Sequence, residues 1–186
     1  MSLTARLPVE HEGVRLRALR RDDLAAFLHY RSDPAVARFQ GWMPMDLARA
    51  RAFIDEQCAL SGVEGGAWRQ LAIADARDDA LLGDLGVWLA PDLTAAELGI
   101  SVTPAAQGGG IGRRAMQAAT VLLFSDPGVQ HVHACADARN MACRRMLQAA
   151  GFREAGATEV VVKGEPCTEF RYTMARPMAA PHGDPA

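Results

Sequence analysis

The sequence predicts a mixed α/β protein in which about four helices cover one sheet of about seven strands. Two patterns predict this class: short segments in which apolar residues alternate, and longer segments with apolar residues at helical spacing. Their order is one strand, two helices, three strands, a helix, a strand, a helix and two strands. The 186 residues, 49% of them hydrophobic, suffice for one domain with a sizeable core. We expect the core over about 14–176, between tails at 1–12 and 177–186.

The first half of the core is predicted from alternation, caps and stops. A strand is expected over residues 14–20, where apolar and basic residues alternate. The first helix opens in an acidic turn and stops at Pro34, and Asp46 is suited to cap the second helix. Strands over 68–74 and 81–89 then form an antiparallel hairpin around a polar turn.

The second half contains the stretch that is most informative about function. Residues 97–102 alternate like a strand with one buried face, and a helix begins after the glycine run that follows. The remaining predicted elements are a strand over 129–136, a helix over 140–150 closed by Gly151, and two strands over 158–163 and 169–174 joined by a turn at 164–166.

The glycine run after this strand predicts an anion site. Gly108, Gly109 and Gly110 carry no Cβ, so their backbone N–H groups can point at a ligand. Beyond Gly112 apolar residues return at helical spacing, so a helix begins at a glycine-lined mouth. Unpaired N–H groups and the positive end of the helix dipole both favour an anion, and a diphosphate is the usual small molecule bound in this way.

Composition excludes several classes of function. A net charge of −2 and a pI near 6.2 do not suit a general nucleic-acid binder, and they fit a basic partner or a cationic small molecule better. The apolar runs are too short for a membrane span and no signal peptide is evident, so we expect a cytoplasmic protein. No metal site is expected, because the four cysteines lack zinc-ligand spacing and His131 and His133 are better explained by strand packing.

Two motifs resemble those of a known family. Gln107, Gly110 and Gly112 match the pattern Q/R-x-x-G-x-G/A, which resembles the acyl-CoA pyrophosphate loop of the GNAT N-acetyltransferase superfamily. The run N-x-x-C-x-x-x-L-x-x-x-G-F, from Asn140 to Phe152, resembles a helix motif of the same superfamily. The resemblance covers nearly all of the core and implies the mostly antiparallel GNAT sheet. The opening V-R-L-R-A-L-R-R-D-D-L is most similar to the ribosomal-protein-alanine acetyltransferase branch.

The resemblance implies a binding site for acetyl-CoA, which is a co-substrate that needs no metal. It implies that backbone amides from Gln107 to Gly112, including that of Ile111, hold the pyrophosphate. It also implies that the strand end at Ile100 and Val102 pairs with the pantetheine arm. The amide of Val102 is expected to polarise the thioester carbonyl.

Four side chains are assigned roles beside these amides. Arg113 is a candidate for the phosphates, with a solvated charge as the alternative, and Asn140 is expected both to cap its helix and to contact the cofactor arm. Glu97 is the candidate base for the substrate ammonium, directly or through a water, with a solvent-facing strand residue as the alternative. Many family members have a tyrosine at the position of Leu147. Here Cys143, where the ribosomal branch has a serine, is the candidate acid for the leaving thiolate, with simple burial as the alternative.

The sequence therefore predicts transfer of an acetyl group from acetyl-CoA to a primary amine, by direct attack in a ternary complex. Two other functions stay open. The fold could bind acyl-CoA as a sensor that lacks an acid. It could also be a dinucleotide-binding oxidoreductase, since Gly110, Gly112 and Ala115 fit G-x-G-x-x-G/A and Asp137 ends the next strand.

The amine acceptor is the least determined partner. The candidates are a protein N-terminal amine, an aminoglycoside-like antibiotic, and a polyamine or other small amine. In the implied fold the acceptor groove lies between segments 36–46 and 164–169, where Phe39, Trp42 and Met43 could line an apolar wall. Relatives in this branch often form homodimers, which the sequence neither supports nor excludes.

Overall fold

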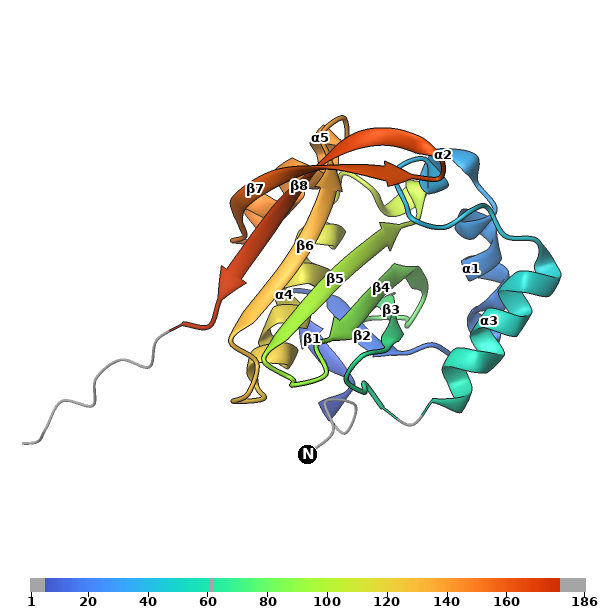
Figure 1. Ribbon diagram of the computed structural model, residues 1–186. Coiled ribbons are helices and arrows are strands. Elements are labelled where there is room, and N and C mark those ends of the chain that lie inside the picture. Colours follow the sequence, from blue (N-terminus) through green and yellow to red (C-terminus); the bar gives the residue numbers. More distant parts are fainter. Residues whose placement is uncertain (1–5, 61, 178–186) are drawn as a thin grey trace, which may run out of the picture.

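The computed structural model describes residues 6–60 and 62–177, which form a mixed sheet of eight strands (Figure 1). The strands lie side by side in the order β1-β2-β3-β4-β5-β6-β8-β7. All neighbouring pairs are antiparallel except β5 and β6, which are parallel. The strands are β1 (Val9–His11), β2 (Val14–Ala18), β3 (Trp68–Asp75), β4 (Leu81–Leu89), β5 (Ala95–Val102), β6 (His131–Asp137), β7 (Arg153–Val162) and β8 (Glu165–Ala175).

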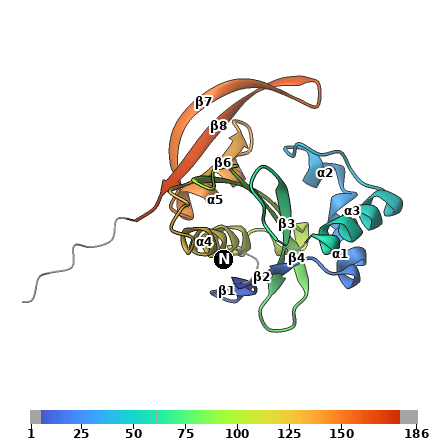
Figure 2. The same ribbon diagram turned by 60° about the horizontal axis from the view of Figure 1, so that its bottom comes forward.

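Five α-helices lie in the described part of the chain, and they cover both faces of the sheet (Figure 2). They are α1 (Leu24–Arg31), α2 (Pro34–Ala37), α3 (Leu47–Ala59), α4 (Ile111–Phe124) and α5 (Met141–Ala149). On one face α4 and α5 pack over the larger core, to which Leu16, Leu85 and Leu98 contribute. On the other face α1 and α3 pack over a smaller core around Phe27 and Ile54. Strand β3 supplies both cores, Leu71 and Ile73 to the larger one and Ala72 to the smaller one, because successive side chains alternate between its faces.

The predicted fold class is confirmed, with corrections at two short elements. Residues 9–11, predicted as a tail, form β1, because the chain reverses at Glu12 and Gly13, both at positive φ, and pairs with β2. The segment after Asp33, predicted to be irregular, forms α2, in which the Asp33 carboxylate accepts a hydrogen bond from the Ala35 amide. The described residues thus contain eight strands and five α-helices, where about seven and about four were predicted. Residues 178–186 of the predicted C-terminal tail lie outside the described residues.

The parallel pairing of β5 and β6 is incomplete, and this positions the site. Only residues 95–97 of β5 pair with residues 131–133 of β6. Beyond that point β5 stays paired with β4 as far as Val102, whereas β6 stays paired with β8 as far as Asp137. The two strands therefore diverge and leave a gap at their carboxyl ends.

The β7–β8 hairpin is longer than predicted and arches over the sheet toward α2 (Figures 1 and 2). Its turn lies at Lys163 and Gly164, with φ of 53° and 84°, and not at 164–166. Positive φ at both residues is the geometry of a type I′ turn, one of the two common two-residue hairpin turns. Lys163 Nζ donates to the carbonyls of Ala37 and Arg38, at 2.6 and 3.3 Å. The tip of the hairpin is thereby fastened to the α2 segment.

A buried polar network joins α1 to the sheet. The fully buried Asp84 carboxylate of β4 accepts hydrogen bonds from Tyr30 Oη at 2.7 Å, from the guanidinium of Arg31 and from the side-chain amide of Gln70. Burial, together with the charge of Asp84, raises the pKa of Tyr30. The Arg31 guanidinium also stacks on Trp42, 4.2 Å from the ring centroid. Trp42 thus packs on this network and does not line the acceptor wall for which it was considered.

Replacing Asp84 should destabilise the fold strongly. In Asp84→Ala the buried Arg31 keeps its charge and loses its carboxylate, and breaking a buried pair in this way costs about 3–5 kcal/mol of the free energy of unfolding. Urea unfolding measures the loss. The control is Asp55→Ala, which removes an exposed partner of Arg21 and should change stability little. Equal losses in the two variants would contradict the importance of this network.

Candidate functional site

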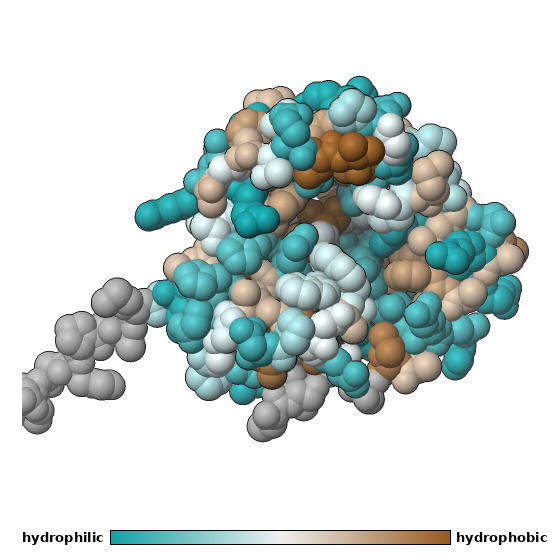
Figure 3. Space-filling model, viewed as in Figure 1, coloured by the Kyte–Doolittle hydropathy of each residue, from teal (hydrophilic) through white to brown (hydrophobic). Residues whose placement is uncertain are grey.

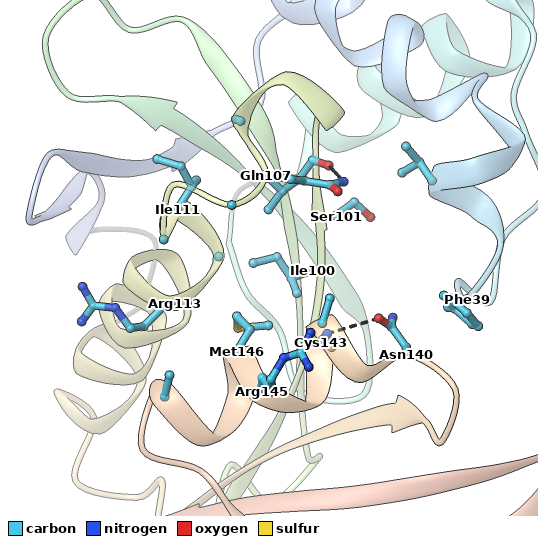
Figure 4. Close-up of a pocket in the computed structure, with 18 of the residues that line it drawn as sticks. Phe39, Ile100, Ser101, Gln107, Ile111, Arg113, Asn140, Cys143, Arg145 and Met146 are labelled. Carbon is cyan, nitrogen blue, oxygen red and sulfur yellow. Dashed lines mark hydrogen bonds between the residues drawn. The ribbon is translucent and has the colours of Figure 1, made fainter.

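The gap between β5 and β6 opens into a cavity of about 620 Å³ (Figure 4). The end of β5, the loop that follows it and the start of α4 form one wall, and α5 forms the opposite wall. Val36, Phe39 and Gln40, from the α2 segment, close a third side. This volume lies in the range of small-molecule and cofactor sites.

The loop between β5 and α4 has the geometry of an anion site. Gly108 and Gly110 have φ of 80° and 77°, a left-handed conformation that costs glycine little. Gly110 is the N-cap of α4, and no acidic residue lies in the first turn, so the N–H groups and the helix dipole favour an anion. Arg114 Nη2 donates to the Gly109 carbonyl at 2.9 Å and holds the loop from outside the cavity.

Two glutamines hold the open edge of β5. Gln40 Nε2 donates to the carbonyl of Ile100 at 3.0 Å, and Gln107 Nε2 donates to that of Val102 at 2.9 Å. The N–H and C=O of one strand residue point toward the same neighbour. The amides of Ile100 and Val102 therefore also face the gap, where β6 no longer pairs with them. This edge offers the backbone donors that an extended ligand needs.

The cavity wall formed by α5 begins at the N-terminus of this helix, which Asn140 caps. Asn140 Oδ1 accepts a hydrogen bond from the Cys143 amide at 3.2 Å, so the predicted helix cap is confirmed (Figure 4). Cys143 borders the cavity, and burial raises the pKa of its thiol to about 11. The thiol is therefore protonated at neutral pH, as a proton donor must be, but it is a weaker acid than an ordinary thiol.

Glu97 lies on the opposite face of the sheet. Its neighbours Ala96 and Leu98 point into the core beside α4, so the alternation of the strand turns Glu97 away from that core. Burial raises the pKa of Glu97, the charge of Arg171 opposes the rise, and the charge of Glu169 adds to it. Glu97 is not among the residues that line the large cavity.

Two arginines border the mouth of the large cavity. Arg113 donates to a Glu12 carboxylate oxygen at 2.9 Å, and in Figure 4 it points away from Ile100 and Cys143. Arg145 is exposed on α5 and lines the cavity, and within residues 6–60 and 62–177 it forms no ion pair. The sequence analysis did not single out Arg145. Helical spacing was the available signal, because residues 142, 145, 146 and 149 share the face of α5 that lines the cavity.

Two further cavities adjoin the large one. A space of about 70 Å³ lies in the gap itself, and Cys143 borders both it and the large cavity. A cavity of about 490 Å³ lies beneath the β7–β8 hairpin, with Phe39 and Met43 in its wall, and this face of the molecule is hollowed there (Figure 3). Glu169 borders both the 70 Å³ and the 490 Å³ space. The three cavities form a series from the glycine loop to the opposite face of the sheet.

The structure brings most of the predicted site residues into one cavity. These are Ile100, Val102, Gln107, Gly108, Gly110, Ile111, Gly112, Arg113, Asn140 and Cys143. Gly109 lies in the same loop without lining the cavity, and Glu97 lies on the other face. Gln40 and Glu169 lie in the segments 36–46 and 164–169 expected to shape the acceptor groove, but neither was assigned a role. No local signal marks Gln40, because its contact with Ile100 joins residues 60 positions apart.

Two further features of the described part of the chain concern metal ions and membrane-spanning helices. There, no group of three or more His, Cys, Asp or Glu side chains is placed to hold a metal ion. No helix of this part is long and apolar enough to cross a membrane.

Several solved structures share this fold. The GNAT-family acetyltransferase from Bacillus anthracis superposes with a TM-score of 0.81, covering 91% of this chain and 99% of that chain at 17% identity. Spermidine N-acetyltransferase from Vibrio cholerae, solved with CoA and spermine, has a TM-score of 0.74, with 88% and 96% covered at 18% identity. RimJ from Mycobacterium smegmatis, solved with CoA-disulfide, has a TM-score of 0.75, with 90% and 85% covered at 21% identity. These likenesses establish the fold.

Sequence similarity gives the family. No curated protein matches this chain significantly. The family model of the acetyltransferase (GNAT) domain matches residues 14–153, which is more than half of the chain and includes both the glycine loop and the Asn140 helix. The chain therefore belongs to the GNAT family of acetyltransferases.

Proposed function

We propose that this protein transfers an acetyl group from acetyl-CoA to a primary amine, which attacks the thioester directly while both substrates are bound. One observation carries the proposal. The cavity with the glycine loop lies on one side of the gap between β5 and β6, and the cavity beneath the hairpin adjoins it on the other side. Two substrates that enter from opposite faces of the sheet can meet in such a gap, which supports a ternary complex.

The residues of the large cavity fit CoA. Amides from Gln107 to Gly112 and the dipole of α4 would hold the pyrophosphate, with Arg145 as a cation on the facing helix. The open edge of β5 would pair with the pantetheine arm. Val102 lies beside the phosphate loop, whereas Leu98 lies four residues deeper, about 13 Å at ~3.3 Å per residue. The thioester is at the far end of the arm. We therefore propose that its carbonyl accepts a hydrogen bond from a β5 amide nearer Leu98, in place of the Val102 amide expected from the resemblance.

The bound coenzyme would supply the activated acetyl group, and the chain would supply the proton transfers. Cys143 borders the gap and is protonated, so it is our candidate to protonate the leaving thiolate, although its pKa of about 11 makes that transfer uphill. Glu97 is a better proton acceptor than an exposed glutamate because burial raises its pKa. It would act through a water, since it lines neither the gap nor the cavity beneath the hairpin.

The acceptor amine is proposed at the level of its class. Phe39 and Met43 are among the apolar residues that line the cavity beneath the hairpin, which suits an amine whose adjoining carbon chain or side chain is apolar. The fold neighbours include RimJ, which supports the ribosomal-protein branch, and a spermidine N-acetyltransferase.

A cytoplasmic location suits the four unpaired cysteines. A homodimer stays a prediction.

The first experiment is a thiol-release assay. The protein is incubated with acetyl-CoA and a panel of alanine-terminated peptides, polyamines and aminoglycosides, and free CoA thiol is monitored. We expect release that depends on one class of amine. Binding of acetyl-CoA without release in the presence of any amine would favour a sensor. Saturation by NAD without a response to acetyl-CoA would favour a dinucleotide-binding enzyme.

The glycine loop can be tested by CoA binding alone. Gly110→Ala forces a Cβ into a left-handed conformation, which costs about 1–2 kcal/mol, although no atom lies within 4 Å of that Cβ. If the loop relaxes to escape this strain, the Kd for CoA in isothermal titration rises about tenfold. The control is Gly109→Ala, where φ is not positive and the new Cβ lies 3.9 Å from the Ala106 carbonyl. Its Kd should stay close to wild type, and an equal loss in both variants would refute the argument.

Kinetics and CoA binding together can distinguish a proton-donating role of Cys143 from a role in packing. If it is the acid, Cys143→Ala lowers kcat about 10²-fold or more, because general acid catalysis typically contributes that much. The Kd for CoA should be unchanged. Cys58→Ala is the control, since that thiol lies on α3 and donates to the Leu19 carbonyl. An unchanged kcat in Cys143→Ala would mean that solvent protonates the thiolate.

A further inference from the structure

Two carboxylates, those of Asp137 and Glu169, border both the space in the gap and the cavity beneath the hairpin. Glu169 of β8 lines both the 70 Å³ space in the gap and the 490 Å³ cavity beneath the hairpin. It is half-buried, and it is paired across the sheet with Asp137 of β6 and Thr158 of β7. An amine that travels from the hairpin side toward the gap must therefore pass this side chain.

Glu169 is better placed for this contact than Glu97. Both side chains lie on the same face, because Glu97 is paired with His133 and Glu169 with Asp137, and the two partners are an even number of residues apart on β6. Those partners lie about 13 Å apart at ~3.3 Å per residue. Glu97 thus lies at the closed end of the gap, where β5 and β6 still pair, and Glu169 lies at its open end.

The charge of Glu169 is available to a ligand. The neighbouring Asp137 carboxylate already has an ion-pair partner, because Arg139 donates to its two oxygens at 2.9 and 2.7 Å. Within residues 6–60 and 62–177, the Glu169 side chain forms no ion pair and accepts no side-chain hydrogen bond. A half-buried carboxylate without a partner is a binding site for a cation, and an ammonium group fits it by charge and by hydrogen bonding.

We propose that Glu169 binds the ammonium group of the acceptor at the entrance to the gap and accepts one of its protons. The inference rests on the proposed acetyl transfer. One proton passes from the ammonium nitrogen to a Glu169 carboxylate oxygen and on to solvent. The freed lone pair forms the C–N bond at the acetyl carbon, and the C–S bond breaks with its electron pair on sulfur. The nitrogen then loses a second proton, through a water to Glu97 or to bulk solvent, and the thiolate gains one from Cys143 or from solvent.

The cavity also guides the choice of probe. Its charged lining residues balance, with three basic and three acidic side chains, namely Arg38, Arg139, Lys163, Asp137, Glu165 and Glu169. A polyamine carries several positive charges and would bind better in an acidic cavity. An acceptor with one ammonium group therefore fits this cavity better than a polyamine does. The probe is a short peptide whose only amine is its N-terminal alanine, and spermidine is the second probe.

The experiment compares Glu169→Gln with two matched variants under acetyl-CoA and the peptide. We expect Glu169→Gln to raise the KM for the peptide and to lower kcat/KM about 10²-fold or more, with the Kd for CoA and the circular dichroism spectrum unchanged. Glu169→Asp, which keeps the charge, should recover part of the activity. Glu159→Gln is the control, because Glu159 is exposed on β7 and accepts a hydrogen bond from Thr168. Its kinetics should match wild type.

The outcomes separate this inference from the proposed function. Wild-type kinetics in a folded Glu169→Gln, or a loss confined to Glu97→Gln, would overturn the role of Glu169 and leave acetyl transfer intact. If Glu169→Gln does not fold, Glu169→Ala takes its place, and a folded Glu169→Ala with wild-type KM and kcat would overturn the role as well, because it has no carboxylate. Absence of thiol release by the wild-type protein with both probes would instead count against the proposed transfer to these amines, whatever the variants do.

Discussion

The short parallel pairing between β5 and β6 is the constraint on which the rest of the site depends. Each strand has its other edge fully paired, β5 with β4 and β6 with β8, so the two can diverge without losing those ladders. Divergence leaves backbone groups without strand partners, and buried backbone groups need partners. Gln40 and Gln107 satisfy the carbonyls of Ile100 and Val102, while the N–H groups of the same residues stay turned to the gap. The opening is therefore a stable feature of the sheet.

The two faces of the sheet supply different chemistry to this opening. On the α4 side, glycine amides, a helix dipole and Arg145 favour the phosphates of a coenzyme. On the hairpin side, the charged residues that line the cavity balance, and the carboxylates of Glu97 and Glu169 lie on this face, where each favours a cation locally. The separation follows from strand alternation, because a residue and its neighbour on one strand point to opposite faces. Under the proposed function, a donor with negative charges and an acceptor with a positive charge would enter from different sides of the same gap.

The walls of the cavity beneath the hairpin come from segments far apart in the chain and are held by specific contacts. Lys163 at the tip of the hairpin donates to Ala37 and Arg38 carbonyls, which fixes the hairpin over α2. On the other side, Asp84 anchors α1 through Arg31 and so positions the segment that follows. These contacts give the cavity a defined shape, which matters because binding pockets on loops are precise only when a rigid scaffold supports them.

Features that depend on neighbours along the chain could be predicted from the sequence. Alternation marked the strands, and side chains such as Asp46 and Asn140 marked the helix caps, which the structure confirms. The glycine loop was likewise visible, since its conformation is local. β1 and α2 escaped notice because elements of three or four residues are too short to show a period. Only the tertiary structure could bring Gln40 to Ile100 or Glu169 to the gap, because these placements follow from strand order and long-range packing, which local spacing does not encode.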